Sequence, residues 1–281
     1  MARTSAINIT NGDGKDSLAE SYGKVIESVQ KGALSEQLKN KDYSGDPTTG
    51  SVEVSRFKNA TSKAYGTARS AGNGDALDNS GKVTINLDQH KEIIEEIEGF
   101  DARTQGVENI IAKRKDNHAK AMIVALDKAF FTAAEAAATA VTTTETEIEA
   151  VAEAMIQAVE TTTNAYVEGV DRADIEMTLS PAAYGKLRNY IDKVPGASVG
   201  SDAEEIAVFH GVRVYSNVRQ TAAILVMASG AVAQPVSVRE YADEKINLSD
   251  AHAVELFYDF GTKVVAADLV KKLATLPTPS A

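Results

Sequence analysis

One long amphipathic stretch, which begins at Asp101, limits the architecture of this chain more than any other feature. Apolar side chains recur on one helical face through residue 137, and most charged side chains lie off that face. The apolar face consists of Val107, Ile111, His118, Met122, Leu126, Phe130 and Ala133 or Ala134. The charged positions are Glu108, Lys115, Asp116, Lys120 and Asp127. Because a helix of roughly 35 residues is about 50 Å long, we expect a rod that suits a building block better than a small enzyme.

The segments on either side of this helix predict strands and further helices, and hence an α+β fold. Before it, residues 51–57 and 82–87 alternate apolar and polar side chains, which predicts the two strands of a hairpin. The connection between them far exceeds the usual hairpin loop of about 2–5 residues, and such long loops are commonly functional or disordered. Residues 91–100 are acidic and predict a third extended or short helical piece.

Shorter signals place the remaining elements. Thr144 and Glu147 predict the capping box of a helix whose core face begins with Ile148, and Ser180 with Pro181 predicts the N-terminus of another helix. Strands are predicted in residues 175–180, 209–217, 222–230 and 231–241, and two more strand-like runs in 251–273 are broken at Gly261. Near the N-terminus, a short amphipathic helix that Gly32 interrupts is predicted from Leu18, Tyr22, Val25, Ile26 and Val29.

The composition excludes several classes of function. The 281 residues include 40 acidic and 29 basic side chains, a net charge of -11, and no cysteine. This acidic balance argues against a dedicated nucleic-acid binder, since Lys and Arg supply most of the affinity for phosphates. No apolar run approaches the roughly 18 residues that span a bilayer. The N-terminus lacks the apolar segment of a signal peptide, so we expect the chain to stay in the compartment where it is made. We also expect no membrane partner.

The connection 55–75 is basic and glycine-punctuated, in contrast to the acidic chain. Its candidate contact residues are Arg56, Phe57, Lys58, Lys63, Tyr65 and Arg69. A grip on nucleic acid would use these aromatic and cationic side chains, but the net charge opposes it, and a merely solvated loop would be unusually long. An arm that docks on an identical chain fits best. The acidic counter-surface is expected at Glu92, Glu95, Glu96 and Glu98, or in the run from Glu145 to Glu153.

The sequence predicts no catalytic, cofactor-binding or metal-binding residue, and therefore no enzyme. His90, His118, His210 and His252 are scattered without metal-ligand spacing. Neither a nucleophile elbow nor a Walker loop nor a dinucleotide fingerprint occurs in the sequence. Residues 72–75 loosely resemble a phosphate cradle, but a turn explains them better because no apolar-striped helix follows. The acids in 92–98 are interpreted as a charged edge rather than as paired catalytic carboxylates.

The order of the pieces supplies one further indication. A polar N-terminal arm and a long two-stranded loop are followed by EEIEGFDAR, the long helix, TLSPAAYGKL, FHGVRVYSN, AILVMASGAVAQP and YDFGTKVVAADLV. This order resembles the major capsid protein of tailed bacteriophages, the Hong Kong-type capsid fold that encapsulin shells share. The resemblance covers nearly the whole chain from about Gly50, and the order carries it more than any single string.

The resemblance implies a division of the chain. Residues 1–48 would form an N-terminal arm that reaches along neighbours, and 49–100 an extended hairpin loop with hinges at Gly50 and Gly81. Residues 101–140 would form the spine helix of a peripheral domain, and 141–235 an axial domain around the five- and six-fold axes. Residues 236–281 would return to the peripheral domain and end in a tail. In a few relatives an extended-loop lysine bonds covalently to an asparagine, here Lys58 or Lys63 with Asn247.

The resemblance also implies partners and location. Pentamers and hexamers of the chain would assemble into an icosahedral shell around double-stranded DNA, which the shell would contact weakly and without sequence specificity. A separate scaffolding protein, a portal protein and, in some relatives, decoration proteins would assist, in the cytoplasm of a bacterial host and then in the virion. Two alternatives stay open: an encapsulin-type compartment for cargo enzyme, and a nucleic-acid-binding module that uses the basic loop 55–75.

Overall fold

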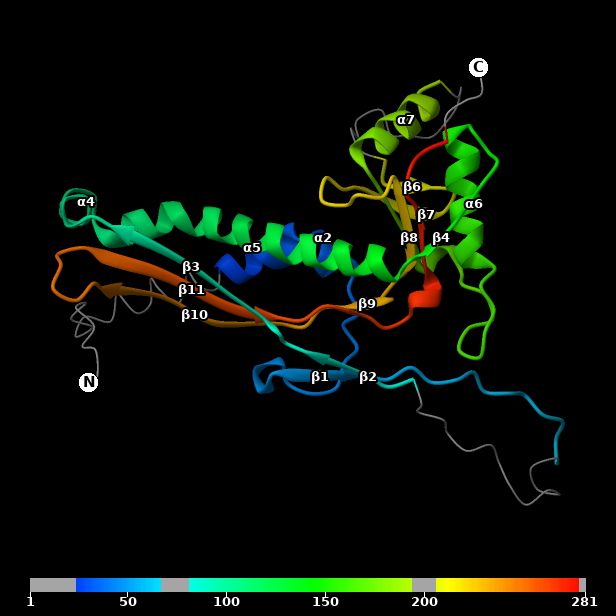
Figure 1. Cartoon of the computed structure of the whole chain (residues 1–281), viewed down its shortest axis with the longest axis horizontal. Helices are drawn as coiled ribbons and strands as arrows, with labels where there is room; N and C mark the ends of the chain where they lie inside the picture. The colour runs from blue at the N-terminus through cyan, green and yellow to red at the C-terminus, as the bar shows by residue number, and fades with distance from the viewer. Residues whose placement is uncertain (1–23, 67–80, 194–205, 278–281) are drawn as a thin grey trace.

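The computed structural model describes residues 24–66, 81–193 and 206–277, except the side chains of residues 107, 108, 112 and 240–244. The predicted rod is the longest element of the molecule (Figure 1). It is divided near its start into α4 (Gly99–Gln105) and α5 (Val107–Ala137). The prediction of one continuous helix from Asp101 is therefore wrong. Gly106, with φ 79° and ψ 134°, takes a conformation that only glycine adopts readily, and it ends α4.

The apolar face predicted for α5 is confirmed by burial. Its buried members are Ile111, His118, Met122, Leu126, Phe130 and Ala134. Ala133 is only half-buried, so Ala134 occupies the core position. The prediction is wrong for Asp127. The pattern places it among the outward charges, whereas its side chain is fully buried. The carboxylate is tolerated there because it accepts hydrogen bonds, which are described below.

The long helix lies along a three-stranded antiparallel sheet, and we call this half of the molecule the platform (Figure 1). The sheet has the order β10 (Val236–Lys245), β11 (His252–Phe260) and β3 (Gln89–Ile97). Residues 91–97, for which extended and helical structures were both open, are thus extended. They belong to a different sheet from the hairpin, so the predicted extended-loop range 49–100 contains a platform strand. Met122 and Leu126 pack with Val254 and Leu256 in the platform core.

A six-stranded sheet stands at the other end of α5, and we call this half the head (Figure 1). Its order is β4 (Thr139–Ala140), β13 (Val270–Leu273), β8 (Ile224–Ala228), β5 (Ile175–Leu179), β7 (Val212–Ser216) and β6 (Val208–Phe209). Helices α6 (Ile148–Glu160) and α7 (Pro181–Ile191) cover one face, and Phe130 and Phe131 of α5 pack on the other. The C-terminal range 236–281 is therefore shared between the halves, since β13 pairs with β8 of the head.

The two helix starts predicted in the head have different outcomes. The Ser180 hydroxyl accepts a hydrogen bond from the backbone N–H of Ala183 at 3.4 Å, and Pro181 is the first helical residue, as predicted. The capping box at Thr144 and Glu147 is wrong. Helix α6 begins at Ile148 with Glu147 as its N-cap and no capping side chain, because the box assumed a start three residues earlier.

The predicted hairpin is present as β1 (Ser51–Val54) and β2 (Val83–Asn86), which pair in antiparallel register. A single turn of 3-10 helix, η1 (Pro47–Thr49), precedes it. Val52, Val54 and Ile85 pack against Ala233, which lies in β9 (Val232–Ala233), the partner of β12 (Lys263–Val264). The hairpin thus lies at the junction of platform and head. The connection after β1 first contacts the head at Arg56 and Asn59 and then extends away from it (Figure 1).

The described part of the predicted N-terminal arm packs on its own subunit. Residues 24–32 are helical, and the helix ends at Gly32, as predicted, before α2 (Leu34–Leu38) begins. Val25 and Val29 are buried in the platform core; Leu18 and Tyr22 lie outside the described residues. Residues 24–38 therefore cover α5 and the sheet of the same chain, whereas the arm was expected to reach along neighbours.

Candidate functional site

The candidate contact loop begins after Val54 and carries exposed aromatic and cationic side chains. Tyr65 is 98% exposed, Phe57 is about half exposed, and Lys58 and Lys63 are exposed as well. Large aromatic side chains that protrude from a fold in this way commonly mark a contact with another molecule. Arg69 and the glycines at 72 and 74 lie outside the described residues. The four described residues therefore share one projecting segment.

Arg56, the first residue of the predicted contact set, instead binds its own subunit. Its guanidinium donates two parallel hydrogen bonds of 2.7 Å to the carboxylate of Asp268, in the 3-10 turn η3 (Ala267–Leu269) of the head. The guanidinium also lies over the ring of Tyr166, 4.6 Å from its centroid. Sequence reasoning gave no signal for this partner, because 212 positions separate the two ionic residues.

The two predicted hinges are different kinds of glycine. Gly50 ends η1 with φ 88°, a left-handed conformation, and a β-carbon there would meet no atom within 4 Å. Gly81 is required by crowding, because a β-carbon there would lie 2.3 Å from the carbonyl oxygen of Arg56. Gly50 directly precedes β1 and Gly81 lies two residues before β2, and hinge motion at either of them stays a prediction.

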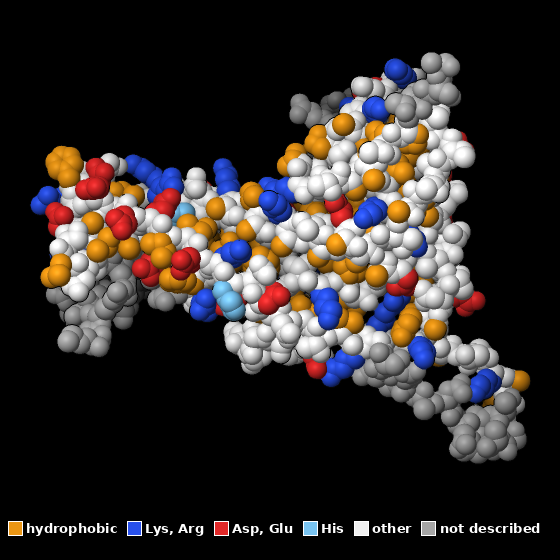
Figure 2. Space-filling view, viewed as in Figure 1, with side chains coloured by type: hydrophobic (Ala, Val, Ile, Leu, Met, Phe, Trp, Pro, Cys, Tyr) orange, Lys and Arg blue, Asp and Glu red, His pale blue; other side chains and the backbone are white. Residues whose placement is uncertain are grey.

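The predicted acidic counter-surface divides between the two faces of β3. Side chains alternate along a strand, so Glu92, Ile94 and Glu96 face solvent while Glu95 faces α5. Glu98 is exposed at the start of α4. Figure 2 shows acidic and hydrophobic side chains gathered at this end of the platform. Phe100 and Leu248 add exposed apolar surface there. We call the outward face of β3 with this end the acidic face.

Glu95 was predicted as a contact residue, but it is a structural group of the platform. Its carboxylate accepts hydrogen bonds from Arg114, and His118, which is buried, lies 2.9 Å from it. The hydrogen bonds from Arg114, against a smaller effect of burial, lower the pKa of Glu95 to about 2. This ion pair fastens β3 to α5.

Two carboxylates of α5 fasten the platform to the head. Asp127 accepts hydrogen bonds from the backbone N–H of Ser35 at 2.9 Å and from Arg219 at 2.8 Å. Two helical turns further on, Glu135 accepts hydrogen bonds from the backbone N–H groups of Thr221 at 2.6 Å and Ala222 at 3.0 Å. Arg219 and its neighbours belong to the loop between β7 and β8, so the N-terminal segment, α5 and the head meet at these residues.

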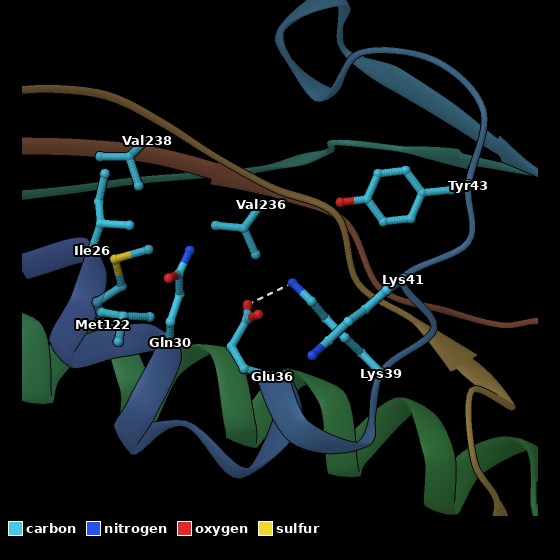
Figure 3. A pocket seen from close by; sticks show the side chains of 10 residues that line it. Ile26, Gln30, Glu36, Lys39, Lys41, Tyr43, Met122, Val236 and Val238 are labelled. Atoms are coloured by element: carbon cyan, nitrogen blue, oxygen red, sulfur yellow. Dashed lines mark hydrogen bonds and ion pairs between the residues drawn. The ribbon is translucent and has the colours of Figure 1, made fainter. Parts of the chain in front are cut away.

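A hollow of about 580 Å³ lies between the N-terminal segment and β10 (Figure 3). Its floor is apolar and includes Met122, Val236 and Val238. Glu36 and Lys39 pair at its polar side at 2.5 Å, and Lys39 also donates to the carbonyl oxygen of Gln234 at 3.2 Å. The lining contains no histidine or cysteine. The hollow combines this apolar floor with a polar side made of Glu36, Lys39, Lys41 and Tyr43.

The four histidines do not converge. Within the described part of the chain, His90 pairs with Asp259 at 2.7 Å, His118 with Glu95, and His210 with Glu153 at 2.8 Å, while His252 lies on β11. Across residues 24–66, 81–193 and 206–277, no three metal-ligating side chains are grouped, and no helix is long and apolar enough to cross a membrane. The exposed side chains of the projecting loop and of the acidic face are the candidate contact residues, and contact between them stays a prediction.

The similarity of this chain to known proteins lies in its structure. No family model matches the chain, and no curated protein sequence matches it. Among solved structures, a chain from Mycobacterium phage Che8 matches with a TM-score of 0.59 at 18% identity, over 80% of this chain and 84% of that chain. The capsid of the cyanophage P-SCSP1u matches with a TM-score of 0.60 at 12% identity, over 86% and 87%. A virus-like particle from Pyrococcus furiosus matches with a TM-score of 0.55 at 11% identity, over 91% and 98%.

These matches cover most of both chains in each pair, so they concern the whole architecture and not one domain. The chain has the α+β fold of tailed-phage capsid proteins, and the resemblance inferred from the order of the sequence elements is confirmed for the fold.

Proposed function

We propose that this chain is the major capsid protein of a tailed bacteriophage, and that copies of it assemble into the icosahedral shell that encloses the double-stranded DNA genome. The observation that carries the proposal is the match to phage capsid structures over 80% or more of this chain, platform and head together. The projecting loop supports it independently, because a segment with exposed aromatic side chains has little value to an isolated subunit.

In the proposed assembly, the projecting loop of one subunit lies on the acidic face of the next. The loop contributes Lys58 and Lys63, and the acidic face contributes Glu92 and Glu96. Opposite charges on two different surfaces of one chain favour a heterologous contact between identical subunits. Repeated contacts of this kind close into rings and shells of pentamers and hexamers. Phe57 and Tyr65 would bury apolar area against Ile94 and Phe100.

Each such contact is weak, and the closed shell makes the contacts collectively strong. We propose that a separate scaffolding protein guides closure, that a portal protein occupies one vertex, and that decoration proteins are optional additions. The net charge of -11 disfavours tight binding to DNA, so the wall would contact packaged DNA weakly and without sequence specificity. The protein would act without catalysis and without a membrane, first in the bacterial cytoplasm and then in the virion.

Asn247 gives the predicted cross-link a position, because it is exposed in the turn between β10 and β11 at the platform end. The proposed bond would join Nζ of Lys58 or Lys63 of a neighbour to the side-chain carbonyl carbon of Asn247, and the amide nitrogen of Asn247 would leave as ammonia. Assembled particles that dissolve fully into monomers in hot detergent would exclude it, and ladders of covalent oligomers that vanish in an Asn247→Ala variant would support it.

Electron microscopy of the purified protein, alone and with a co-expressed scaffolding protein, tests the proposed function. We expect rings, sheets or closed shells in at least one of these conditions. Monomers under every condition would contradict the proposal. Weak, salt-dependent binding to DNA at physiological ionic strength is expected, and tight binding by the isolated subunit would favour the nucleic-acid module instead.

A compartment without a genome is the second candidate, favoured by the match to the virus-like particle from Pyrococcus furiosus. The nucleic-acid content of particles from the natural source separates the candidates. Particles that protect genome-length DNA from nuclease support the phage capsid, whereas particles that hold a protein cargo support the compartment.

A further inference from the structure

The root of the projecting loop, residues 56–59, is bound to the head, and Gly81 packs against the same place. Arg56 makes its two hydrogen bonds of 2.7 Å to Asp268, whose other partner is the side-chain amide of Asn164. The backbone N–H of Asn59 donates to the carbonyl oxygen of Ala165 at 2.9 Å. The far end of the loop closes against the same place, since Gly81 packs on the backbone of Arg56 and on the ring of Tyr166.

These contacts are strong for a group near the surface. Arg56 and Asp268 are only 18% and 30% exposed, and a bidentate pair of this type is stronger and more directional than a single hydrogen bond. Burial alone would raise the pKa of Asp268, but the hydrogen bonds from Arg56 and Asn164 outweigh it and lower that pKa. The ring of Tyr166 adds a cation–π contact.

The partner surface belongs to the head, and its turn is held by internal hydrogen bonds. Asp268 lies in η3, which immediately precedes β13, a strand of the six-stranded sheet. Asn164 and Tyr166 lie in a tight turn after α6, where the side-chain oxygen of Asn164 accepts hydrogen bonds from the backbone N–H groups of Tyr166 and Val167 at 2.8 and 3.1 Å. The turn is closed by a further hydrogen bond from Gly169 N–H to the carbonyl oxygen of Thr162.

We propose that Arg56, Asp268, Asn164 and Tyr166 form a clamp that makes the head set the direction of the projecting loop. Arg56 is then a positioning residue for subunit contact rather than a contact residue itself. The inference rests on the proposed function for its consequence: a rotation of the head would move residues 57–66 across the neighbouring subunit. The clamp itself is a property of the single subunit and can be tested without assembly.

The first test measures amide hydrogen exchange at Asn59 and in residues 57–66 of the isolated subunit. In Arg56→Ala, we expect exchange at Asn59 to rise by about tenfold or more, since a charge-assisted hydrogen bond no longer holds the root. The matched control is Lys82→Ala, which removes an ion pair to Glu53 across the same hairpin, with both side chains more than 40% exposed. Unchanged exchange in Arg56→Ala overturns the clamp, as does an equal rise in the control.

The second test exploits the absence of cysteine from the chain. The backbones of Asn59 and Ala165 share a hydrogen bond of 2.9 Å, which brings the two residues close enough for a disulfide between cysteines placed there to test their proximity. Asn59→Cys with Ala165→Cys should therefore oxidise within the subunit, and in assembled particles we expect this bond to hold shells at one diameter under conditions in which wild-type shells change diameter. Failure to oxidise in a folded subunit overturns the clamp, and locked subunits whose shells change diameter like wild type overturn the coupling of loop to head.

The charge-swapped variant Arg56→Asp with Asp268→Arg distinguishes loss of the ion pair from a general loss of folding. We expect it to recover part of the protection at Asn59 that either single change removes, while neither single change shifts the melting of the platform. No recovery contradicts the ionic clamp. If wild-type protein never assembles, the proposed function fails while the exchange result still decides the clamp. If shells form normally in Arg56→Ala with an unprotected root, the function stands and the positioning role fails.

Discussion

The long helix α5 and the projecting loop use apolar and charged side chains in opposite ways. Nearly every large apolar side chain of α5 lies in one of the cores of its own subunit, and its buried acid Asp127 is paired there too. The loop buries only its root, and it exposes Phe57 and Tyr65. The difference separates two tasks: the helix holds one subunit together, and the loop is available to another. Changes in α5 should therefore alter subunit stability, and changes in the loop should alter assembly alone.

The largest effect is expected for Phe130→Ala. Phe130 is fully buried where α5 meets the head, and it packs edge-to-face on Phe131 with ring centroids 5.3 Å apart. The substitution should lower the free energy of unfolding by about 3–5 kcal/mol, because it removes transfer energy and leaves a cavity. Urea denaturation of the isolated subunit measures this. Val124→Ala, exposed on the same helix, is the control, and an equal loss in both variants would contradict the assigned faces of α5.

A smaller, pH-dependent effect is expected for Glu95→Gln. The pKa of Glu95 is lowered from 4.5 to about 2 in the folded chain, so its ion pair with Arg114 contributes stability that is fully present above pH 4.5. That contribution is lost as the pH falls toward 2. The difference in unfolding free energy between wild type and variant should thus be largest near neutral pH and shrink through this window.

The control for this prediction lies on the other face of the same strand. Glu92→Gln, at an exposed position of the acidic face, should change the unfolding free energy by less than about 0.5 kcal/mol. A difference between wild type and Glu95→Gln that stays constant from pH 7 to pH 3 would show that Glu95 does not act through its charge.

The smallest effect on the subunit is expected for the double variant Lys58→Glu with Lys63→Glu. Both side chains are exposed, so the unfolding free energy should change by less than about 0.5 kcal/mol. Assembly should nevertheless fail or slow sharply, because the reversed charges meet Glu92 and Glu96 of a neighbour. Light scattering during assembly measures this. The charge-preserving variant Lys58→Arg with Lys63→Arg should assemble like wild type, and normal assembly of the glutamate variant would refute the docking role of these charges.

Local patterns predicted the elements well and their partners poorly. The helical face of α5, the hairpin strands and the Ser180 cap depend on neighbours a few residues apart, and each is confirmed. The break at Gly106 required the backbone conformation of one glycine, which an apolar pattern does not record. The buried Asp127 depends on Arg219, distant in sequence, and so could not be inferred from its helix.

The candidate site shows the same limit. Four acids in residues 92–98 looked equivalent, although the alternation of a strand sends Glu95 inward once the segment is known to be extended. That alternation was the available signal, and the open choice between strand and helix concealed it. The partnership of Arg56 with Asp268 left no signal, because their spacing reflects the tertiary fold alone.

A density map of assembled particles by cryo-electron microscopy tests the central claim most directly. The account predicts a closed icosahedral shell in which residues 57–66 of each subunit cross a subunit boundary and lie on Glu92 and Glu96 of the neighbour, with Arg56 still paired to Asp268 of its own chain. A shell in which this loop folds back on its own platform, or lies over a surface without these acids, would contradict it.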